Sequence, residues 1–234
     1  MTASLDAAQA LDRVQARIRS ACGAVGRPHD QLALLAVSKL QPTEKIRALY
    51  AAGQRAFGEN YPQEAVTKVA ALTDLPEIEW HLIGPLQSNK TRDIAESLHW
   101  VHSVDRLKIA ERLSAQRPAV MPPLNVCIQV NISNEASKSG VSPDDVEALT
   151  HAVSALPHLR LRGLMGMPEP GIGDEKTRAQ FELLRALFER EKQKHPTMDT
   201  LSMGMSDDLE IAVACGSTMV RVGTALFGAR PAKT

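Results

Sequence analysis

The sequence is poor in aromatic residues and carries no surplus of charge of either sign. It contains two Trp and two Tyr among 234 residues, and its 27 Lys and Arg are balanced by 27 Asp and Glu. A protein that binds nucleic acid without sequence preference needs a basic surplus for the phosphates and aromatic rings on which bases stack. The composition therefore argues against a nucleic-acid-binding function.

Long apolar runs and paired cysteines are missing as well. No apolar run approaches the roughly 18–20 residues that span a bilayer. The first 20 residues form a charged amphipathic pattern rather than a secretory signal. Cys22, Cys127 and Cys215 lie in apolar or helical surroundings, which is typical of buried thiols in a reducing compartment. We expect a cytoplasmic protein that is a monomer and does not contact membranes.

Metal binding has little support in the sequence. His81 alternates with Ile83 along an expected strand, and a histidine with satisfied hydrogen bonds in the core is the simplest interpretation. No second His or Cys stands at the spacing that a metal site requires. We predict no metal.

Strand-like and helix-like segments alternate along the chain. The expected strands cover residues 32–37, 55–60, 78–84, 100–104, 124–131, 159–167, 200–203 and 218–223, with helical patterns between them. About eight such units without a break in composition favour a closed parallel barrel over an open doubly wound sheet, and no G-x-G-x-x-G follows the first strand. We predict an α/β protein with one domain over residues 1–234, a (β/α)8 TIM barrel with an extra N-terminal helix in residues 1–26.

Lys39 stands at the end of the first expected strand. Residues 32–37 are all apolar, as in a strand buried on both faces, and counting back by twos places Lys39 on the inward side with Val37 and Leu35. A barrel keeps its chemistry at this end of its strands. Three interpretations are open at this point: a solvated lysine, an ion-pair partner, or an amine for carbonyl chemistry.

Two further signals lie near the end of the chain. The loop 203–208 contains Ser206 before a helical pattern, and Gly223 with Thr224 follows the last strand. These loops follow strands seven and eight, where many barrels bind phosphate, although Ser206 could simply cap the helix. Arg221 lies inside an apolar strand, so it needs either an acidic partner or a ligand. An amine, a phosphate cradle and a cation between them together suit pyridoxal 5′-phosphate (PLP), which has an aldehyde, a phosphate and a pyridine nitrogen.

Several motifs then resemble one family over nearly the whole chain. The YggS/PROSC family of PLP homeostasis proteins, itself similar to the N-terminal barrel of alanine racemase, shows stretches like "LLAVSKLQP", "FGENYPQEA", "WHLIGPLQSNK", "VNISNEASKSG" and "LSMGMSDDLEIAVACGSTMVRVGTALFG". The resemblance implies that Lys39 forms an imine with PLP and that Arg221 faces the pyridine nitrogen. It also implies that Ser206, Gly223 and Thr224 form a phosphate cradle. Asn60, Ile83 and Met205 would line the cofactor.

The resemblance implies a protein that holds PLP in the cell and passes it to PLP-dependent apo-enzymes, so affecting amino-acid metabolism. A racemase-like enzyme is the alternative. After Gly228 only "ARPAKT" follows, whereas alanine racemases continue into a second domain with another base, so we expect no robust catalytic activity. A third alternative is a lyase that uses Lys39 without a cofactor, but such an enzyme would give Arg221 no ligand to bind. Lys138, in the loop after strand five, is either a solvated lysine or a site for a further anion.

Overall fold

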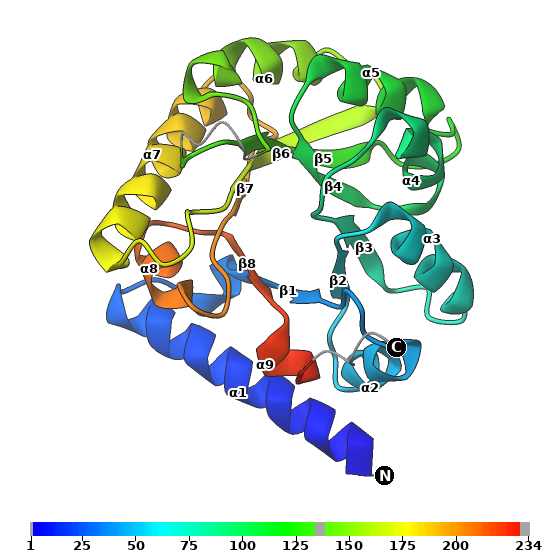
Figure 1. Ribbon diagram of the computed structural model, residues 1–234, viewed down its shortest axis with the longest axis vertical. Coiled ribbons are helices and arrows are strands. Elements are labelled where there is room, and N and C mark those ends of the chain that lie inside the picture. The colour runs from blue at the N-terminus through cyan, green and yellow to red at the C-terminus, as the bar shows by residue number, and fades with distance from the viewer. Residues whose placement is uncertain (1, 134–138, 230–234) are drawn as a thin grey trace.

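Eight parallel strands close into a barrel in the order of the sequence. The computed structural model describes residues 2–133 and 139–229, the first four of them by backbone alone. The predicted (β/α)8 barrel is confirmed (Figure 1). Its strands are β1 (Ala33–Val37), β2 (Ala56–Glu59), β3 (Glu79–Leu82), β4 (Trp100–Val104), β5 (Leu124–Val130), β6 (Leu159–Gly166), β7 (Thr200–Ser202) and β8 (Met219–Val222).

Helices surround the barrel because each parallel strand needs a crossover connection to reach the next. They are α1 (Thr2–Ala24), α2 (Thr43–Ala51), α3 (Pro62–Ala71), α4 (Thr91–Ser97), α5 (Leu107–Gln116), α6 (Val146–Ser154), α7 (Asp174–Lys192), α8 (Leu209–Ala214) and α9 (Thr224–Phe227). No helix in the described part of the chain is long and apolar enough to cross a membrane.

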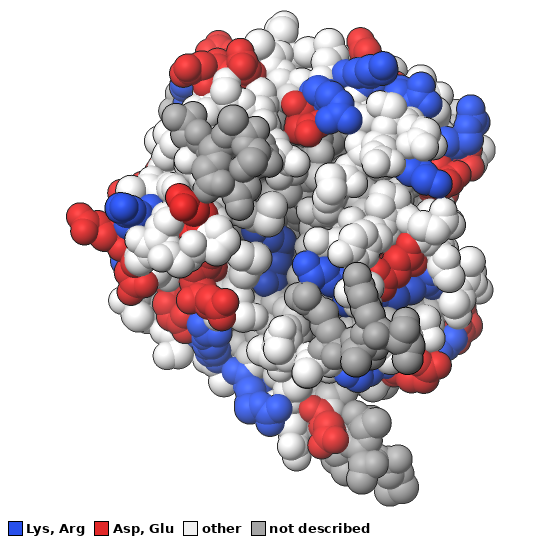
Figure 2. All heavy atoms as spheres, in the orientation of Figure 1, with Lys and Arg blue, Asp and Glu red and all other residues white. Residues whose placement is uncertain are grey.

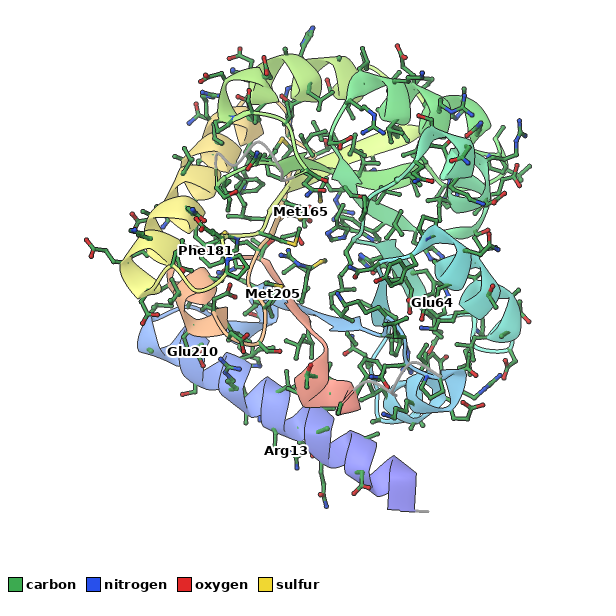
Figure 3. All side chains as sticks on the ribbon, viewed as in Figure 1. Arg13, Glu64, Met165, Phe181, Met205 and Glu210 are labelled. Carbon is green, nitrogen blue, oxygen red and sulfur yellow. The ribbon has the colours of Figure 1, made fainter. Side chains whose placement is uncertain are left out.

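The main apolar core lies between the strands and this outer helical layer. Ile46 of α2, Phe57 of β2 and Phe181 of α7 belong to it and have no solvent-accessible surface (Phe181 is labelled in Figure 3). Burying one such side chain contributes about 1.5–3 kcal/mol, so this layer carries most of the stabilisation. Trp100, Cys127 and Met165 form a separate small cluster from the neighbouring strands β4, β5 and β6.

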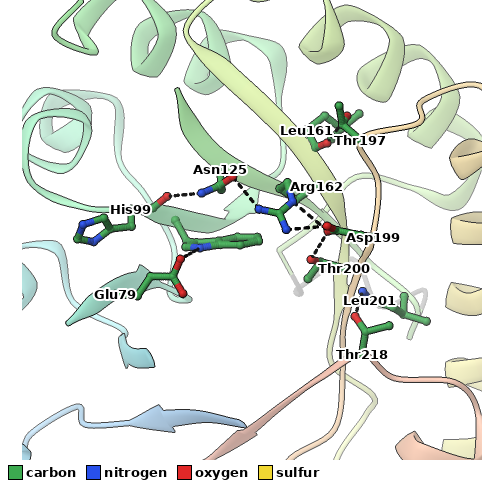
Figure 4. A network of polar contacts seen from close by, with 11 residues as sticks. Glu79, His99, Asn125, Leu161, Arg162, Thr197, Asp199, Thr200, Leu201 and Thr218 are labelled. Atoms are coloured by element: carbon green, nitrogen blue, oxygen red, sulfur yellow. Dashed lines mark hydrogen bonds and ion pairs between the residues drawn. The ribbon is translucent and has the colours of Figure 1, made fainter. Parts of the chain in front are cut away.

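A polar network closes the end of the barrel at which the strands begin (Figure 4). The Arg162 guanidinium binds both carboxylate oxygens of Asp199, at 2.9 and 2.6 Å, and lies over the Trp100 ring with Cζ 4.5 Å from its centroid. Trp100 Nε1 donates to Glu79 Oε1 at 2.8 Å. Because this end is filled by paired side chains, any open site is expected at the opposite end.

The N-terminal helix α1 packs across α2, α8 and α9, low in the view of Figure 1. Its apolar stripe of Leu11, Val14 and Ile18 is buried in the main core. It occupies most of the range 1–26 expected for this helix.

Two details near the chain end differ from the sequence-based expectation. Ser206 does not cap the following helix: α8 begins at Leu209, its N-cap position is Asp208, and the Asp208 carboxylate accepts from the Met205 N–H at 2.5 Å. The last strand is followed by the short helix α9, with Gly223 at its N-cap position, where only a turn was expected. Ser206 therefore stays in the loop after β7, and Thr224 is the first residue of α9.

Candidate functional site

One cavity of about 660 Å³ opens at the end of the barrel where the strands finish. Figure 2 shows a hollow near the middle of the visible face, with basic side chains inside it. Every residue that the sequence singled out for a cofactor lines this cavity, although they come from five strands and their loops: Lys39, Asn60, Ile83, Met205, Ser206, Arg221, Gly223 and Thr224.

Lys39 lies in the turn that follows β1 and is half-buried. The register between β1 and β8 pairs Leu35 with Arg221, so Lys39 stands four residues beyond the point where the arginine leaves the neighbouring strand. The lysine and the arginine therefore reach the same cavity from adjacent strands.

Arg221 is almost completely buried, at 3% exposure, and burial lowers its pKa to about 10. Its Nη1 donates to the backbone oxygen and the hydroxyl of Ser202, at 2.7 and 2.9 Å, and its Nη2 donates to the Gly166 oxygen at 3.1 Å. Within the described ranges it makes no ion pair with an acidic side chain, and its Nε–H makes no hydrogen bond. The ion-pair interpretation of Arg221 therefore has no support, and the guanidinium stays cationic at neutral pH.

The hydrogen bonds of Arg221 continue through Ser202 to two buried histidines. Ser202 Oγ lies 3.0 Å from His102 Nδ1, and His102 Nε2 lies 2.9 Å from His81 Nδ1. Burial lowers the pKa of both imidazoles, that of His102 well below its ordinary value. His81 is thus a core histidine, as its alternation with Ile83 suggested, but its hydrogen bonds are not all satisfied: Nε2 makes none within the described residues and lies 3.5 Å from Glu79 Oε2. The pair contacts Ser202, which in turn accepts from Arg221.

The loops after β7 and β8 offer polar groups for an anion. Nothing among the described residues hydrogen-bonds to the hydroxyls of Ser206 and Thr224. Gly204, which leads into this loop, has φ of +95°, and a Cβ there would lie 2.5 Å from the Ala212 Cβ, so only glycine fits. Asp207 also lines the cavity, and its negative charge opposes anion binding.

Asn60 adds an unsatisfied group at the end of β2. Its Oδ1 is buried and has no hydrogen-bond partner in the described part of the chain. A buried polar atom without a partner is rare in native proteins and points to a missing ligand or water.

Gln129 and Asn131 also line the cavity, and sequence analysis did not single them out. Both stand at the end of β5, and the rule that polar residues at strand ends face a barrel's site could have found them. Lys138, the candidate for a further anion site, lies outside the described residues.

Comparison with known proteins agrees with this geometry. The family described as "Alanine racemase, N-terminal domain" matches residues 10–231. A protein of Pseudomonas aeruginosa named pyridoxal phosphate homeostasis protein is 59% identical over 95% of this chain and 95% of its own length. This chain belongs to the pyridoxal phosphate homeostasis protein family.

Solved structures place the family among alanine racemase-like barrels. PipY of Synechococcus elongatus, solved with PLP bound, is 40% identical over 95% of this chain and 100% of its own, with a TM-score of 0.82. Alanine racemase of Corynebacterium glutamicum has a TM-score of 0.67 at 19% identity, covering 94% of this chain and 62% of the racemase. The second likeness concerns the fold alone.

Proposed function

We propose that this chain binds PLP in the cavity at the barrel mouth, holds it as an imine with Lys39, and acts in intracellular PLP homeostasis. The observation that carries the proposal is that an amine, a buried cation and a hydroxyl-bearing wall line one cavity: Lys39, Arg221, and Ser206 with Thr224. PipY, a relative at 40% identity, binds the same cofactor. The whole of residues 1–234 would serve this one site.

The groups that lack partners fit the parts of PLP. The hydroxyls of Ser206 and Thr224, with the backbone at Gly223, would hold the phosphate. We call these three residues the phosphate wall. A Cβ at Gly223 would lie 3.3 Å from the Val37 oxygen, so glycine leaves space there for the phosphate. Ile83 and Met205 would contact the ring as apolar walls, and the orphaned Asn60 Oδ1 would accept a hydrogen bond from the bound molecule.

Arg221 decides what the cofactor can do. PLP supplies an electrophilic aldehyde and a ring that withdraws electrons most strongly when its nitrogen is protonated. A guanidinium is a permanent donor with no acceptor atom, so Arg221 facing that nitrogen would keep it unprotonated. The site would then store the cofactor better than it would catalyse carbanion chemistry. The racemase alternative has no support beyond the shared fold.

The rim of the cavity suits delivery of PLP to PLP-dependent apo-enzymes. Four exposed large apolar side chains lie in the loops after strand ends: Leu40, Tyr61, Met167 and Met205, with exposures of 38–51%. An apolar rim around a cofactor site is a surface that a recipient protein can cover. The three buried free thiols suit a reducing cytoplasm, where we place this function.

Absorbance of the purified protein mixed with PLP tests the proposal. We expect a visible imine band that borohydride bleaches, with the cofactor mass fixed onto Lys39 in a peptide digest. The Lys39→Ala variant should bind PLP without that band, because the phosphate wall remains. Lys108→Ala is a matched control, since Lys108 is exposed on α5 and does not line the cavity. A parent protein that gives no band at saturating PLP would contradict the imine.

A further inference from the structure

A buried ionic cluster lies directly behind the turn that carries Lys39. Glu59 ends β2, Lys68 and Glu64 come from α3, and the Glu59 and Lys68 side chains are 0% and 7% exposed. Figure 3 labels Glu64 on α3, beside the strands. Sequence analysis assigned these residues no role, and they do not line the cavity.

The Lys68 ammonium uses all three of its N–H bonds within this cluster. Nζ donates to the Ser38 oxygen at 2.7 Å, to Glu59 Oε1 at 2.8 Å and to Glu64 Oε1 at 2.7 Å. Glu59 Oε1 also accepts from Ser38 Oγ at 2.5 Å. Because an ammonium has three donors, Lys68 has none left for a ligand. Its contacts instead hold Ser38, the residue before Lys39.

The residue after Lys39 is held by the same cluster in an unfavourable conformation. Leu40 has φ of +59° and is the only non-glycine residue with positive φ in the described chain. Its N–H donates to Glu64 Oε1 at 2.6 Å. The Leu40 side chain is 38% exposed, so its burial does not account for the strain. A left-handed leucine costs about 1–2 kcal/mol and persists only where its surroundings impose it.

Ser38 to Gln41 form a tight turn with Lys39 at its second position. The Gln41 N–H donates to the Ser38 oxygen at 3.0 Å, which closes the turn. The third position of a turn with positive φ usually belongs to glycine or asparagine, and here it is Leu40. Two side chains of α3 thus hold the residues on either side of Lys39: Lys68 bonds to Ser38, and Glu64 bonds to Leu40. Lys39 itself lines the cavity.

We propose that Glu59, Lys68 and Glu64 are positioning residues that fix the Ser38–Gln41 turn so that the Lys39 amine meets the aldehyde of PLP. This inference rests on the proposed imine at Lys39. A lysine side chain has four rotatable bonds, so only an anchored backbone limits where its amine can reach. Orienting the reacting groups is what makes bond formation within a site fast. Removing one partner of such a buried cluster leaves an uncompensated charge. The sharpest test therefore changes the length and the charge of one side chain in separate variants.

Two substitutions of the half-buried Glu64 make that separation. Glu64→Asp keeps the charge and shortens the side chain by one methylene, so its carboxylate cannot reach both Leu40 and Lys68. Glu64→Gln keeps an oxygen at the same reach and removes the charge. The readouts are the rate at which the imine band appears after mixing with PLP, and the affinity for pyridoxine 5′-phosphate, which has the phosphate and ring but no aldehyde.

We expect Glu64→Asp to slow imine formation about tenfold or more, the effect of one charge-assisted hydrogen bond. Its affinity for pyridoxine 5′-phosphate should stay within about twofold of the parent's, since the phosphate wall is untouched. Glu64→Gln should lie nearer the parent than Glu64→Asp does. Glu96→Asp is the matched control, because Glu96 on α4 pairs with Arg92 at 3.6 Å on the surface and does not line the cavity.

Two results would overturn the inference alone. One is a folded Glu64→Asp variant that forms the imine at the parent's rate. The other is an equal loss of both readouts, which would mean a general structural role. If Glu64→Asp does not fold, Glu64→Ala takes its place, since it also removes the contacts with Leu40 and Lys68. Imine formation at the parent's rate in that folded variant would overturn the inference. A parent chain that forms no imine would overturn the proposed function and, with it, this inference.

Discussion

Ser206 and Thr224 are separate residues from Lys39, and we expect them to serve a different part of the cofactor. Their hydroxyls make no hydrogen bond with the described residues, while Lys39 lines the same cavity from the end of β1. The covalent bond and the phosphate contacts would therefore come from different residues. Covalent attachment and affinity should separate when these residues are changed.

The double variant Ser206→Ala with Thr224→Val tests this separation. We expect imine formation to remain possible at high PLP concentration, while affinity falls by orders of magnitude, because charge-assisted hydrogen bonds contribute roughly 1.5–3 kcal/mol each. Cofactor retained after dialysis and the absorbance spectrum measure the two properties. Ser20→Ala with Thr67→Val, at exposed positions on α1 and α3, is the matched control. Retention of PLP like the parent's would mean that the phosphate site lies elsewhere.

At the scale of elements, α1 reaches the loop that bears Ser206. Arg17 Nη1 donates to the Ser206 oxygen at 2.7 Å, and the same guanidinium binds both carboxylate oxygens of Glu210, each at 2.6 Å. Figure 3 shows Glu210 between α8 and α1. The loop that bears Ser206 is thus hydrogen-bonded to a helix that lies far away in sequence and outside the barrel.

Replacing Arg17 with alanine should weaken PLP binding more than it weakens the fold. The Arg17–Glu210 pair is 37% and 55% exposed, so its loss should change the free energy of unfolding by about 1 kcal/mol or less. The loss of the Ser206 contact should lower affinity several-fold, as expected for one hydrogen bond to a charged group. Equilibrium titration with PLP and urea unfolding measure the two effects.

Arg13→Ala is the control for that experiment. Arg13 is exposed one turn earlier on α1 and is labelled in Figure 3. Equal affinities for the Arg17→Ala and Arg13→Ala variants would show that α1 does not influence the phosphate wall.

At the scale of the whole molecule, a chain of polar side chains runs through the barrel interior. Arg221 donates to Ser202, Ser202 contacts His102, and His102 contacts His81. His81 Nε2 lies 3.5 Å from the carboxylate of Glu79, a residue of the network in Figure 4. The interior therefore contains two buried imidazoles that must stay neutral. Their titration links the stability of the whole chain to pH.

Stability should fall as the pH is lowered from about 7.5 to 5.5. Burial lowers the pKa of His81 and His102 in the folded chain, whereas an unfolded chain takes up protons on both below about pH 6.5. Their contribution is thus complete above the unfolded pKa and is lost below it, by up to about 1.4 kcal/mol per pH unit for each histidine. Urea unfolding at several pH values measures it.

Single-histidine variants assign the effect. His102→Gln should flatten the pH dependence, while His29→Gln, at an exposed position, should leave it unchanged. Equal slopes for these two variants would show that the buried pair is not the source.

The sequence by itself determined the barrel and most of the cavity lining. Alternating strands and helices predict a parallel barrel, and in such a barrel every strand ends at the same face, so Lys39, Asn60 and Arg221 had to share a mouth. Only the tertiary structure decided what surrounds them. Glu64 and Lys68 are four residues apart on a helix, a spacing typical of a solvated surface pair. The packing of α3 against β2 and β3 instead buries the Lys68 ammonium against the Ser38 oxygen.

The same holds for Ser202 and His102, which lie 100 residues apart. Local spacing cannot report such contacts, because burial and pairing between distant segments are set when the barrel closes.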